Sequence, residues 1–282
     1  MAVEVLALEE PELVPTVRRP SRLAKIWRVT WPKLLATALL VGAWQLVVWS
    51  GWKPEYIIPS PFTVFDRVST DRALLWDAAI VTLKRGLLGF AVAVLIGGIV
   101  GISVARVRVL RDAIGSMVTG LQTMPSVAWL PLAVILFKLG EGAIFFVIVL
   151  GAAPSIANGI IDGIDHVPPI LLRAGHVLGA RGLSSLRHVV IPAAMPSVIS
   201  GLKQGWAFAW RSLMAGELIT TIPGHQGLGN YLNQSKDLAD YTGVYAAMVV
   251  IFVIGIIIDA VFFGTAERGI RRRYGLIDDA QR

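Results

Sequence analysis

The sequence predicts an all-α polytopic membrane protein with six transmembrane helices and both termini in the cytoplasm. The chain has 282 residues, of which 55% are hydrophobic and only 16% are charged, and its mean hydropathy is +0.67. This composition is typical of proteins embedded in a bilayer. Apolar stretches of about 20 residues, the length needed to cross the hydrocarbon core, recur along the chain. One multi-spanning domain therefore describes the sequence better than two soluble domains.

The first part of the chain is predicted to be a cytoplasmic tail over residues 1–33. Its early glutamates and the absence of an early apolar segment argue against a cleaved secretory signal. The first span is predicted over residues 34–49, with tryptophans at its outer end, where aromatic rings suit the interface with water. An amphipathic helix on the outer surface is expected within residues 53–77.

The second span is predicted over residues 78–105. It contains five glycines, which would let a neighbouring helix approach closely. Lys84 and Arg85 lie near its outer end, so we expect both side chains to reach the interface. Three arginines in residues 106–111 then mark a short cytoplasmic loop.

The third span, predicted over residues 114–139, contains Pro125 and Pro131. Proline removes a backbone donor and clashes with the preceding turn, so we expect this helix to be kinked or broken. Broken helices often line a pathway, although a tolerated structural kink explains the prolines equally well. The fourth span is predicted over residues 144–161.

The second half of the chain follows the same alternation of apolar runs and polar connections. Its predicted elements are an inner loop at about 164–192, a fifth span at 194–219, an outer loop at 222–240 and a last span at 243–263. The predicted domains are a cytoplasmic tail over 1–33, a membrane domain over 34–266 and a second cytoplasmic tail over 267–282.

The Lys and Arg residues support this topology, because they gather beside the ends of apolar runs on the side assigned to the cytoplasm. The net charge of +7 is therefore better explained by membrane orientation than by nucleic-acid binding. The positive residues placed outside are Lys53, Arg67, Arg72, Lys138 and Lys236.

The fifth predicted span is unusual because it contains Lys203, Gln204, Arg211 and Glu217. Ionisable groups at membrane depth usually face a bundle interior or a water-filled cavity. At about 100° per residue, Lys203 and Arg211 lie within roughly 80° of each other, so we expect both to line a positive pathway. Glu217 lies about 120° from Arg211 and is expected to be a structural partner of another helix. Alternatively, Lys203 reaches the cytoplasmic face while Arg211 pairs with a carboxylate or carbonyl groups of another helix.

A polar, glycine-containing segment over residues 173–196 separates the fourth and fifth spans. It carries basic side chains and no acidic residue, which places it in the cytoplasm. Apolar residues at helical spacing up to Leu178, interrupted by Gly179 and Gly182, predict a short helix, a turn and a second helix from Leu183.

Five residues of this segment, Ala174, Gly179, Val189, Ile191 and Pro192, fall at the spacing of a known signature. They resemble the EAA loop of bacterial ABC-importer permeases, in which Glu-Ala-Ala, three residues, Gly, nine residues, Ile, one residue and Leu-Pro follow one another. The flanking sequence looks most similar to permeases of the aliphatic sulfonate, taurine, nitrate and bicarbonate importers. The resemblance extends over roughly residues 35–270.

Two positions depart from the signature, since Arg173 stands where it has Glu and Gly175 stands where it has the second Ala. The resemblance implies the type I ABC-importer permease architecture in a bacterial cytoplasmic membrane, with this loop docking as coupling helices into an ATPase subunit. The implied coupling residues are Arg173, Ala174, Gly175, Gly179, Val189, Ile191 and Pro192.

The same resemblance implies the partners of the chain. These are a dimer of ABC ATPase subunits that hold ATP and Mg²⁺, a second permease subunit in what we expect to be a homodimer, and an extracytoplasmic solute-binding protein. The function implied is import of a small, anionic solute of the sulfonate, taurine, nitrate or bicarbonate class. The alternatives are a permease for another small organic solute, such as a pyrimidine or an aromatic acid, or a membrane scaffold or sensor that moves no solute.

The sequence contains none of the motifs that would give the chain chemistry of its own. It lacks the phosphate-binding G-x-x-x-x-G-K-[ST] pattern, metal-binding histidine spacing, a G-x-S-x-G elbow and any cysteine. We therefore expect no catalytic residue, no metal site and no cofactor in this chain, and no nucleic-acid partner.

Overall fold

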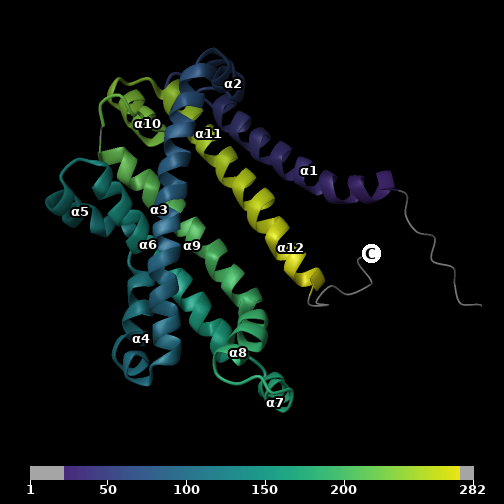
Figure 1. Cartoon of the computed structure of the whole chain (residues 1–282). Helices are drawn as coiled ribbons and strands as arrows, with labels where there is room; N and C mark the ends of the chain where they lie inside the picture. The colour runs from purple at the N-terminus through teal and green to yellow at the C-terminus, as the bar shows by residue number, and fades with distance from the viewer. Residues whose placement is uncertain (1–21, 221, 274–282) are drawn as a thin grey trace, which may run out of the picture. The chain divides into compact units, whose positions relative to one another are not determined.

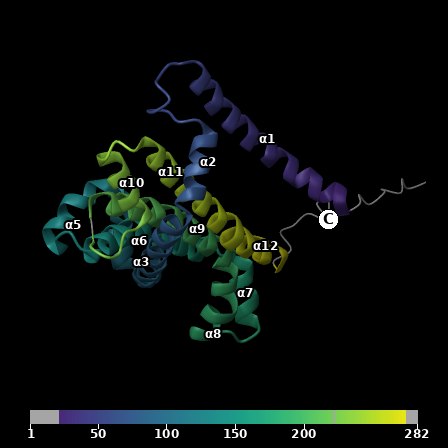
Figure 2. The ribbon, with the colours of Figure 1, turned by 90° about the horizontal axis from the view of Figure 1, so that it is seen from above.

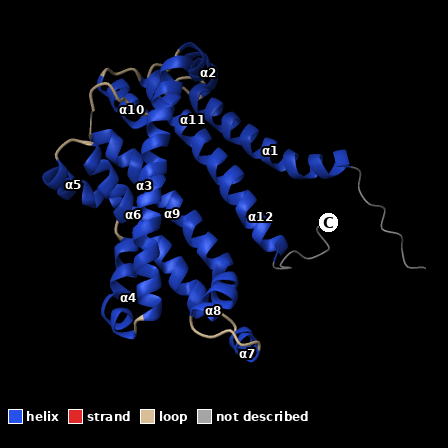
Figure 3. Ribbon diagram, in the orientation of Figure 1, coloured by secondary structure: helices blue, strands red, loops and turns tan. Residues whose placement is uncertain are grey.

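The computed structural model of the chain describes residues 22–220 and 222–273. Within these ranges the regular elements are all helical and no β-strand occurs, which confirms the predicted all-α class (Figures 1 and 3). The chain divides into two units, residues 1–52 and residues 53–282.

Four helical stretches are long and apolar enough to cross a bilayer: Thr30–Trp49, Arg72–Arg106, Glu141–Asp165 and Tyr241–Ile270. A pair of helices at Arg108–Thr123 and Ser126–Phe137 meets the same requirement when its two parts are taken together. The helix over the predicted fifth span, α9 (Ile191–Ile219), has 29 residues and is long enough to cross, but it is more polar than the others.

The first unit contains one helix, α1 (Arg22–Trp49). It begins well before Leu34, so residues 22–33 are helical rather than part of an extended tail. Lys and Arg are good helix formers, and Pro32 is accommodated inside the helix. The rest of the predicted tail, residues 1–21, lies outside the described residues.

The centre of the second unit is formed by α3 (Arg72–Arg106), α6 (Glu141–Asp165) and α9, which lie side by side in two views (Figures 1 and 2). Small and branched apolar side chains from all three helices pack against one another and form one core. The buried members are Ala93, Ile144, Ile148, Ala152, Ala153, Ile156, Ala209 and Leu213.

Glycines allow these helices to touch through their backbones. A Cβ added to Gly159 of α6 would lie 2.5 Å from the Cα atom of Gly201 in α9, a distance that only glycine permits. On α3, a Cβ at Gly97 would lie 2.6 Å from the carbonyl oxygen of Ala153. The close packing predicted from the glycines of α3 is therefore present at Gly97, whereas Gly98 faces open space.

The break predicted in the third span is confirmed. α4 (Arg108–Thr123) ends just before Pro125, a short 3-10 helix, η1 (Ser126–Trp129), follows, and α5 (Leu130–Phe137) completes the pair. The two parts are bent by 105° relative to each other. Pro125 cannot continue the hydrogen bonding of α4 and disfavours helical geometry at the residue before it, which explains the position of the break.

The end of the second unit that carries α2 (Pro61–Thr70) and α10 (Leu228–Asp237) is tied together by polar contacts. Asp71 accepts hydrogen bonds from Nε of Arg67 at 2.7 Å and from the Tyr231 hydroxyl at 2.9 Å, and Arg67 also donates to Asp240 at 2.6 Å. Burial raises the pKa of the Tyr231 phenol, and its hydrogen bond to Asp71 also raises it. The predicted outer helix is thus limited to α2, because the chain turns at Asp71 and α3 begins.

The last predicted span is continuous but longer than expected. It consists of α11 (Tyr241–Ile258), a π-helical turn, η3 (Asp259–Phe263), and α12 (Gly264–Arg273). The start of the predicted C-terminal tail at Glu267 is therefore helical, and residues 274–282 lie outside the described residues.

Candidate functional site

A polar cavity of about 460 Å³ lies between α4, α6 and α9. Apart from glycine, its wall consists of hydroxyl, amide and carboxylate side chains, and the cavity has an open side where several of them are exposed. The lining residues are Thr119, Gln122, Ser155, Asn158, Gly159, Asp162, Ser197, Ser200, Gly201 and Gln204.

The helical repeat explains why these residues meet. On α6, Ser155, Asn158 and Asp162 are three and four residues apart and therefore share one face. Ser197, Ser200 and Gln204 form the matching stripe on α9. The backbone contact between α6 and α9 brings the two stripes together, and α4 closes the third side.

An amide pair connects α4 to this wall. Nδ2 of Asn158 donates a hydrogen bond to Oε1 of Gln122 at 2.6 Å, and Nε2 of Gln122 lies 3.5 Å from Oγ of Ser155. Gln122 stands immediately before the break at Pro125. The broken helix therefore contributes a side chain to the cavity.

The four pathway residues proposed from the sequence occupy four different environments. Gln204 lines the cavity. Lys203 does not; its Nζ lies 3.5 Å from Oδ1 of Asp259 and 3.9 Å from Oε2 of Glu267. Arg211 is exposed, donates to the carbonyl oxygen of Ala207 and stacks over the Phe208 ring.

Replacing Lys203 with Gln should change the free energy of unfolding by no more than about 1 kcal/mol, because partly exposed ion pairs contribute little. The Lys203 side chain is 39% exposed, and its two acidic neighbours are at least as exposed. Thermal unfolding of the purified protein in detergent measures this change. A loss of several kcal/mol would contradict the small role assigned to these ion pairs.

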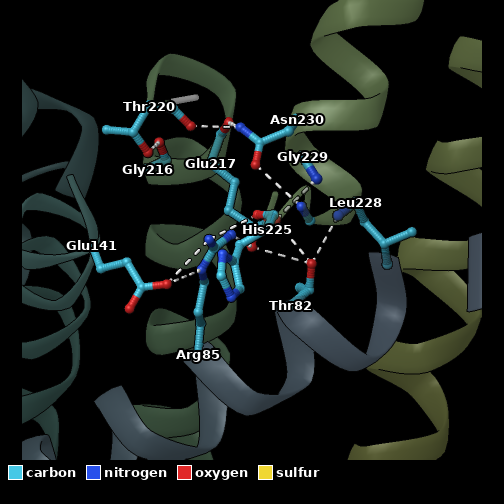
Figure 4. Close-up of polar contacts among 11 residues, drawn as sticks. Thr82, Arg85, Glu141, Gly216, Glu217, Thr220, His225, Leu228, Gly229 and Asn230 are labelled. Carbon is cyan, nitrogen blue, oxygen red and sulfur yellow. Dashed lines mark hydrogen bonds and ion pairs between the residues drawn. The ribbon is translucent and has the colours of Figure 1, made fainter. Parts of the chain in front are cut away.

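Glu217, the fourth pathway candidate, is fully buried in a polar network at the other end of α9 (Figure 4). Nη1 of Arg85 donates to Oε1 of Glu217 at 3.1 Å, and both side chains are almost completely buried. The Thr82 hydroxyl lies 2.9 Å from Oε2 and donates to the carboxylate. Arg85 also donates to the carbonyl oxygen of His225 at 2.9 Å and lies 3.3 Å from half-exposed Glu141.

This network fixes the segment that connects α9 to α10. The backbone N–H of Gly229 donates to Oε2 of Glu217 at 3.0 Å, and that of Leu228 donates to Oγ1 of Thr82 at 2.8 Å. Nδ2 of Asn230 donates to the carbonyl oxygens of Glu217 and Thr220, each at 2.5 Å. The Glu217 carboxylate thus accepts a hydrogen bond from an N–H group in the first turn of α10, where N–H groups have no partner within their own helix.

The expectation that Arg85 reaches the interface is wrong. Its side chain points into the bundle and is neutralised by Glu217 and Glu141, since a buried guanidinium is tolerated only when it is paired. The position of Arg85 in the sequence indicates that it lies near the outer end of a span, but it does not identify an acidic partner. The only sequence signal for such a partner is Glu217, an acidic residue within another predicted span.

The inner loop has the geometry predicted from its glycines. α7 (Pro169–Val177) is followed by Gly179 with φ +86° and Gly182 with φ +54°, and a helical segment, α8 (Leu183–Ser185), then begins at Leu183. A π-helical turn, η2 (Leu186–Val190), leads into α9. No atom lies within 4 Å of a Cβ built at Gly179, so the backbone conformation alone requires glycine there.

The other proposed coupling residues lie on both sides of this turn. Gly175 faces Val189, whose Cγ2 atom would lie 2.7 Å from an added Cβ. Gly175, which replaces the second Ala of the signature, therefore packs against a residue at a later position of the same signature. Ala174 accepts the backbone hydrogen bond of Leu178 near the end of α7, whereas Arg173 is exposed. Ile191 and Pro192 directly follow the π-helical turn η2, from which the helix continues into α9.

Apolar side chains on this loop are strongly exposed. Val177 and Leu178 are each 86% exposed, and Leu183 is 79% exposed. Exposed apolar side chains are a feature of many interaction sites. Within residues 22–220 and 222–273, no group of three or more His, Cys, Asp or Glu could hold a metal ion.

Comparison with known proteins relates this architecture to one family. Residues 93–272 match the family model described as the binding-protein-dependent transport system inner membrane component. A putative ABC transporter permease protein from Methanocaldococcus jannaschii is 34% identical over 66% of this chain and 68% of its own length. The taurine transport system permease protein of Escherichia coli is 27% identical over 83% and 88% of the two chains.

A further relative and a solved structure agree with these matches. The bicarbonate transport system permease protein of Synechococcus elongatus is 28% identical over 90% of this chain and 95% of its own. A chain of the MetNI methionine ABC transporter, crystallised in an inward-facing conformation, superposes with a TM-score of 0.54 at 18% identity, covering 70% of this chain and 93% of that one. The structural match supports the fold alone.

Proposed function

Because the chain belongs to the family of binding-protein-dependent transport system inner membrane components, we propose that it forms the solute pathway of an ATP-driven importer. The solute proposed is a small anion of the sulfonate, taurine, nitrate or bicarbonate class, delivered by an extracytoplasmic binding protein. The family is one of inner membrane translocation subunits, and relatives of this chain are named for taurine and bicarbonate transport.

The orientation we propose has six spans with both termini and the inner loop at 164–192 in the cytoplasm. α9 is the additional span, in which Gln204 lines the cavity and Glu217 is buried against Arg85, whereas Arg211 is exposed. The basic residues of the inner loop and of α12 then lie on the cytoplasmic side, in agreement with the positive-inside rule. α2 and α10 lie on the extracytoplasmic side.

The observation that carries the proposal is the polar cavity. Ser155, Asn158 and Asp162 lie in the second half of α6, and Ser197 to Gln204 lie in the first half of α9. In the proposed orientation, both halves are cytoplasmic. The extracytoplasmic end is held by the Arg85–Glu217 network, so this arrangement suits release of a solute toward the cytoplasm.

We propose that ATP hydrolysis takes place on a separate pair of ABC ATPase subunits, which hold ATP and Mg²⁺. The exposed loop with Val177, Leu178 and Leu183 is the surface proposed for docking, and the rigid turn at Gly179 transmits the movement. A second permease copy in a homodimer would cover the open side of the cavity, where Gln204 is exposed. Arg211, also exposed, would reach the pathway only through that assembly.

The test is reconstitution of the chain with the ATPase and the binding protein encoded beside it. The complex in liposomes should take up labelled taurine, nitrate or bicarbonate only when ATP is supplied, and its mass should correspond to two permease and two ATPase subunits. Uptake of a pyrimidine or an aromatic acid instead would support an importer but contradict the proposed solute class. A complex that assembles but moves none of these solutes would favour a scaffold or sensor.

A further inference from the structure

The wall of the cavity contains many hydrogen-bond donors and no positive charge. Four hydroxyl groups and the amides of Gln122, Asn158 and Gln204 can all donate, each hydroxyl with one hydrogen and each amide with two. Among the described residues, no Lys, Arg or His lines the cavity. The single ionisable side chain in the wall is that of Asp162.

We propose that this cavity is a transit site that binds a small oxyanion through neutral hydroxyl and amide donors, and that Gln122, Asn158 and Gln204 determine its specificity. The inference rests on the proposed function, because it takes the solute to be an anion. It assigns recognition of the anion to hydrogen bonds from neutral side chains, whereas the sequence predicted that Lys203 and Arg211 would attract it.

The surroundings of the two cations support this assignment. Lys203 is held by Asp259 and Glu267, on the side of α9 that faces η3 and α12. Arg211 is exposed two helical turns beyond Gln204 on the same face of α9, and it does not line the cavity of the single chain. Neither residue belongs to the cavity wall, so an oxyanion there would obtain its contacts from the neutral donors.

Neutral donors suit a site that must release its solute. A transport pathway has to bind strongly enough for entry and weakly enough for exit, and a buried ion pair would slow the second step. Asp162 also favours release of an anion. It lies three residues before the end of α6, is exposed and lines the cavity, where a carboxylate opposes retention of an anion.

The geometry of the amide pair makes a conservative test available. In Gln122→Glu, a carboxylate oxygen can still accept the hydrogen bond from Asn158, so the variant keeps the shape and the inter-helix contact. It loses a donor and introduces a negative charge into the wall. Asp162→Asn makes the opposite change of charge in the same cavity without disturbing a buried residue.

The experiment uses the complete transporter in liposomes and measures ATP-dependent uptake of labelled taurine, nitrate and bicarbonate, each tested singly. Gln122→Glu should reduce uptake of the transported anion by about tenfold or more, because like charges at close range are strongly unfavourable. Asp162→Asn should keep uptake and lower its KM by a few-fold. Gln234→Glu, the same chemical change on an exposed position of α10, is the matched control and should match the wild type.

ATP hydrolysis stimulated by the binding protein should be retained in all three variants, which separates a solute effect from failed assembly. Equal uptake by Gln122→Glu and the wild type would overturn the transit site. A wild-type complex that carries only an uncharged solute, such as a pyrimidine, would overturn the oxyanion inference but would still support an importer. If the wild-type complex showed no ATP-dependent uptake, both the proposed function and the inference that rests on it would be wrong.

Discussion

Replacing Glu217 with Gln is expected to lower the free energy of unfolding by about 3–5 kcal/mol, because the change leaves the buried guanidinium of Arg85 without its principal counter-charge. Glu217 has no exposed surface and Arg85 is 3% exposed, so water cannot replace the lost partner. The carboxylate also accepts hydrogen bonds from Thr82 and Gly229, which a single amide oxygen serves less well. Chemical denaturation of the purified protein in detergent measures the loss.

Two further variants separate the charge from the hydrogen bonds. Glu141→Gln removes the half-exposed partner of Arg85 and should cost no more than about 1 kcal/mol. Arg85→Met combined with Glu217→Gln should recover part of the stability lost in Glu217→Gln, because the unpaired buried charge is then absent. Equal losses in Glu141→Gln and Glu217→Gln would show that burial does not decide the strength of these ion pairs.

Replacing Gly179 with Val is expected to abolish ATP-driven uptake while the protein still inserts into the membrane. The residue has φ +86°, a conformation that costs a β-branched side chain about 1–3 kcal/mol. The turn would relax to another geometry, and the exposed apolar residues beyond it would no longer be presented as they are. Uptake and ATP hydrolysis by the reconstituted complex measure the effect.

Gly269 provides the matched control for this substitution. It lies in α12 without a positive φ, and a Cβ built on it meets no atom within 4 Å. Gly269→Val should therefore retain nearly all uptake. Full uptake by Gly179→Val would show that the turn at Gly179 is not the coupling element.

Local chemistry was enough to predict the inner loop and the broken span. Gly179, Gly182 and Pro125 act on their own backbones, and the structure has left-handed turns and a sharp bend at these positions. Helix boundaries were less accurate. Residues 22–33 belong to α1 despite Pro32, and residues 267–273 belong to α12.

The polar network and the cavity could be predicted only in part, because both depend on which helices are neighbours. Arg85 and Glu217 are far apart in sequence, and only the packing of α3 against α9 makes them partners. The spacing of Ser155, Asn158 and Asp162 on one face of α6 was a readable signal for a polar wall. Gln122 was not, since its place in the wall depends on how α4 packs against α6.

The close contacts between α6 and α9 are spread along both helices. A Cβ built at Gly163 would lie 2.9 Å from the carbonyl oxygen of Ala194, and one built at Gly216 would lie 3.4 Å from the Cα atom of Ile144, on either side of the contact between Gly159 and Gly201. Helices packed at this density over most of their length resist pivoting about one point. In the proposed importer, a movement received at the inner loop would therefore reach the level of Glu217 through displacement of α6 and α9 as one body.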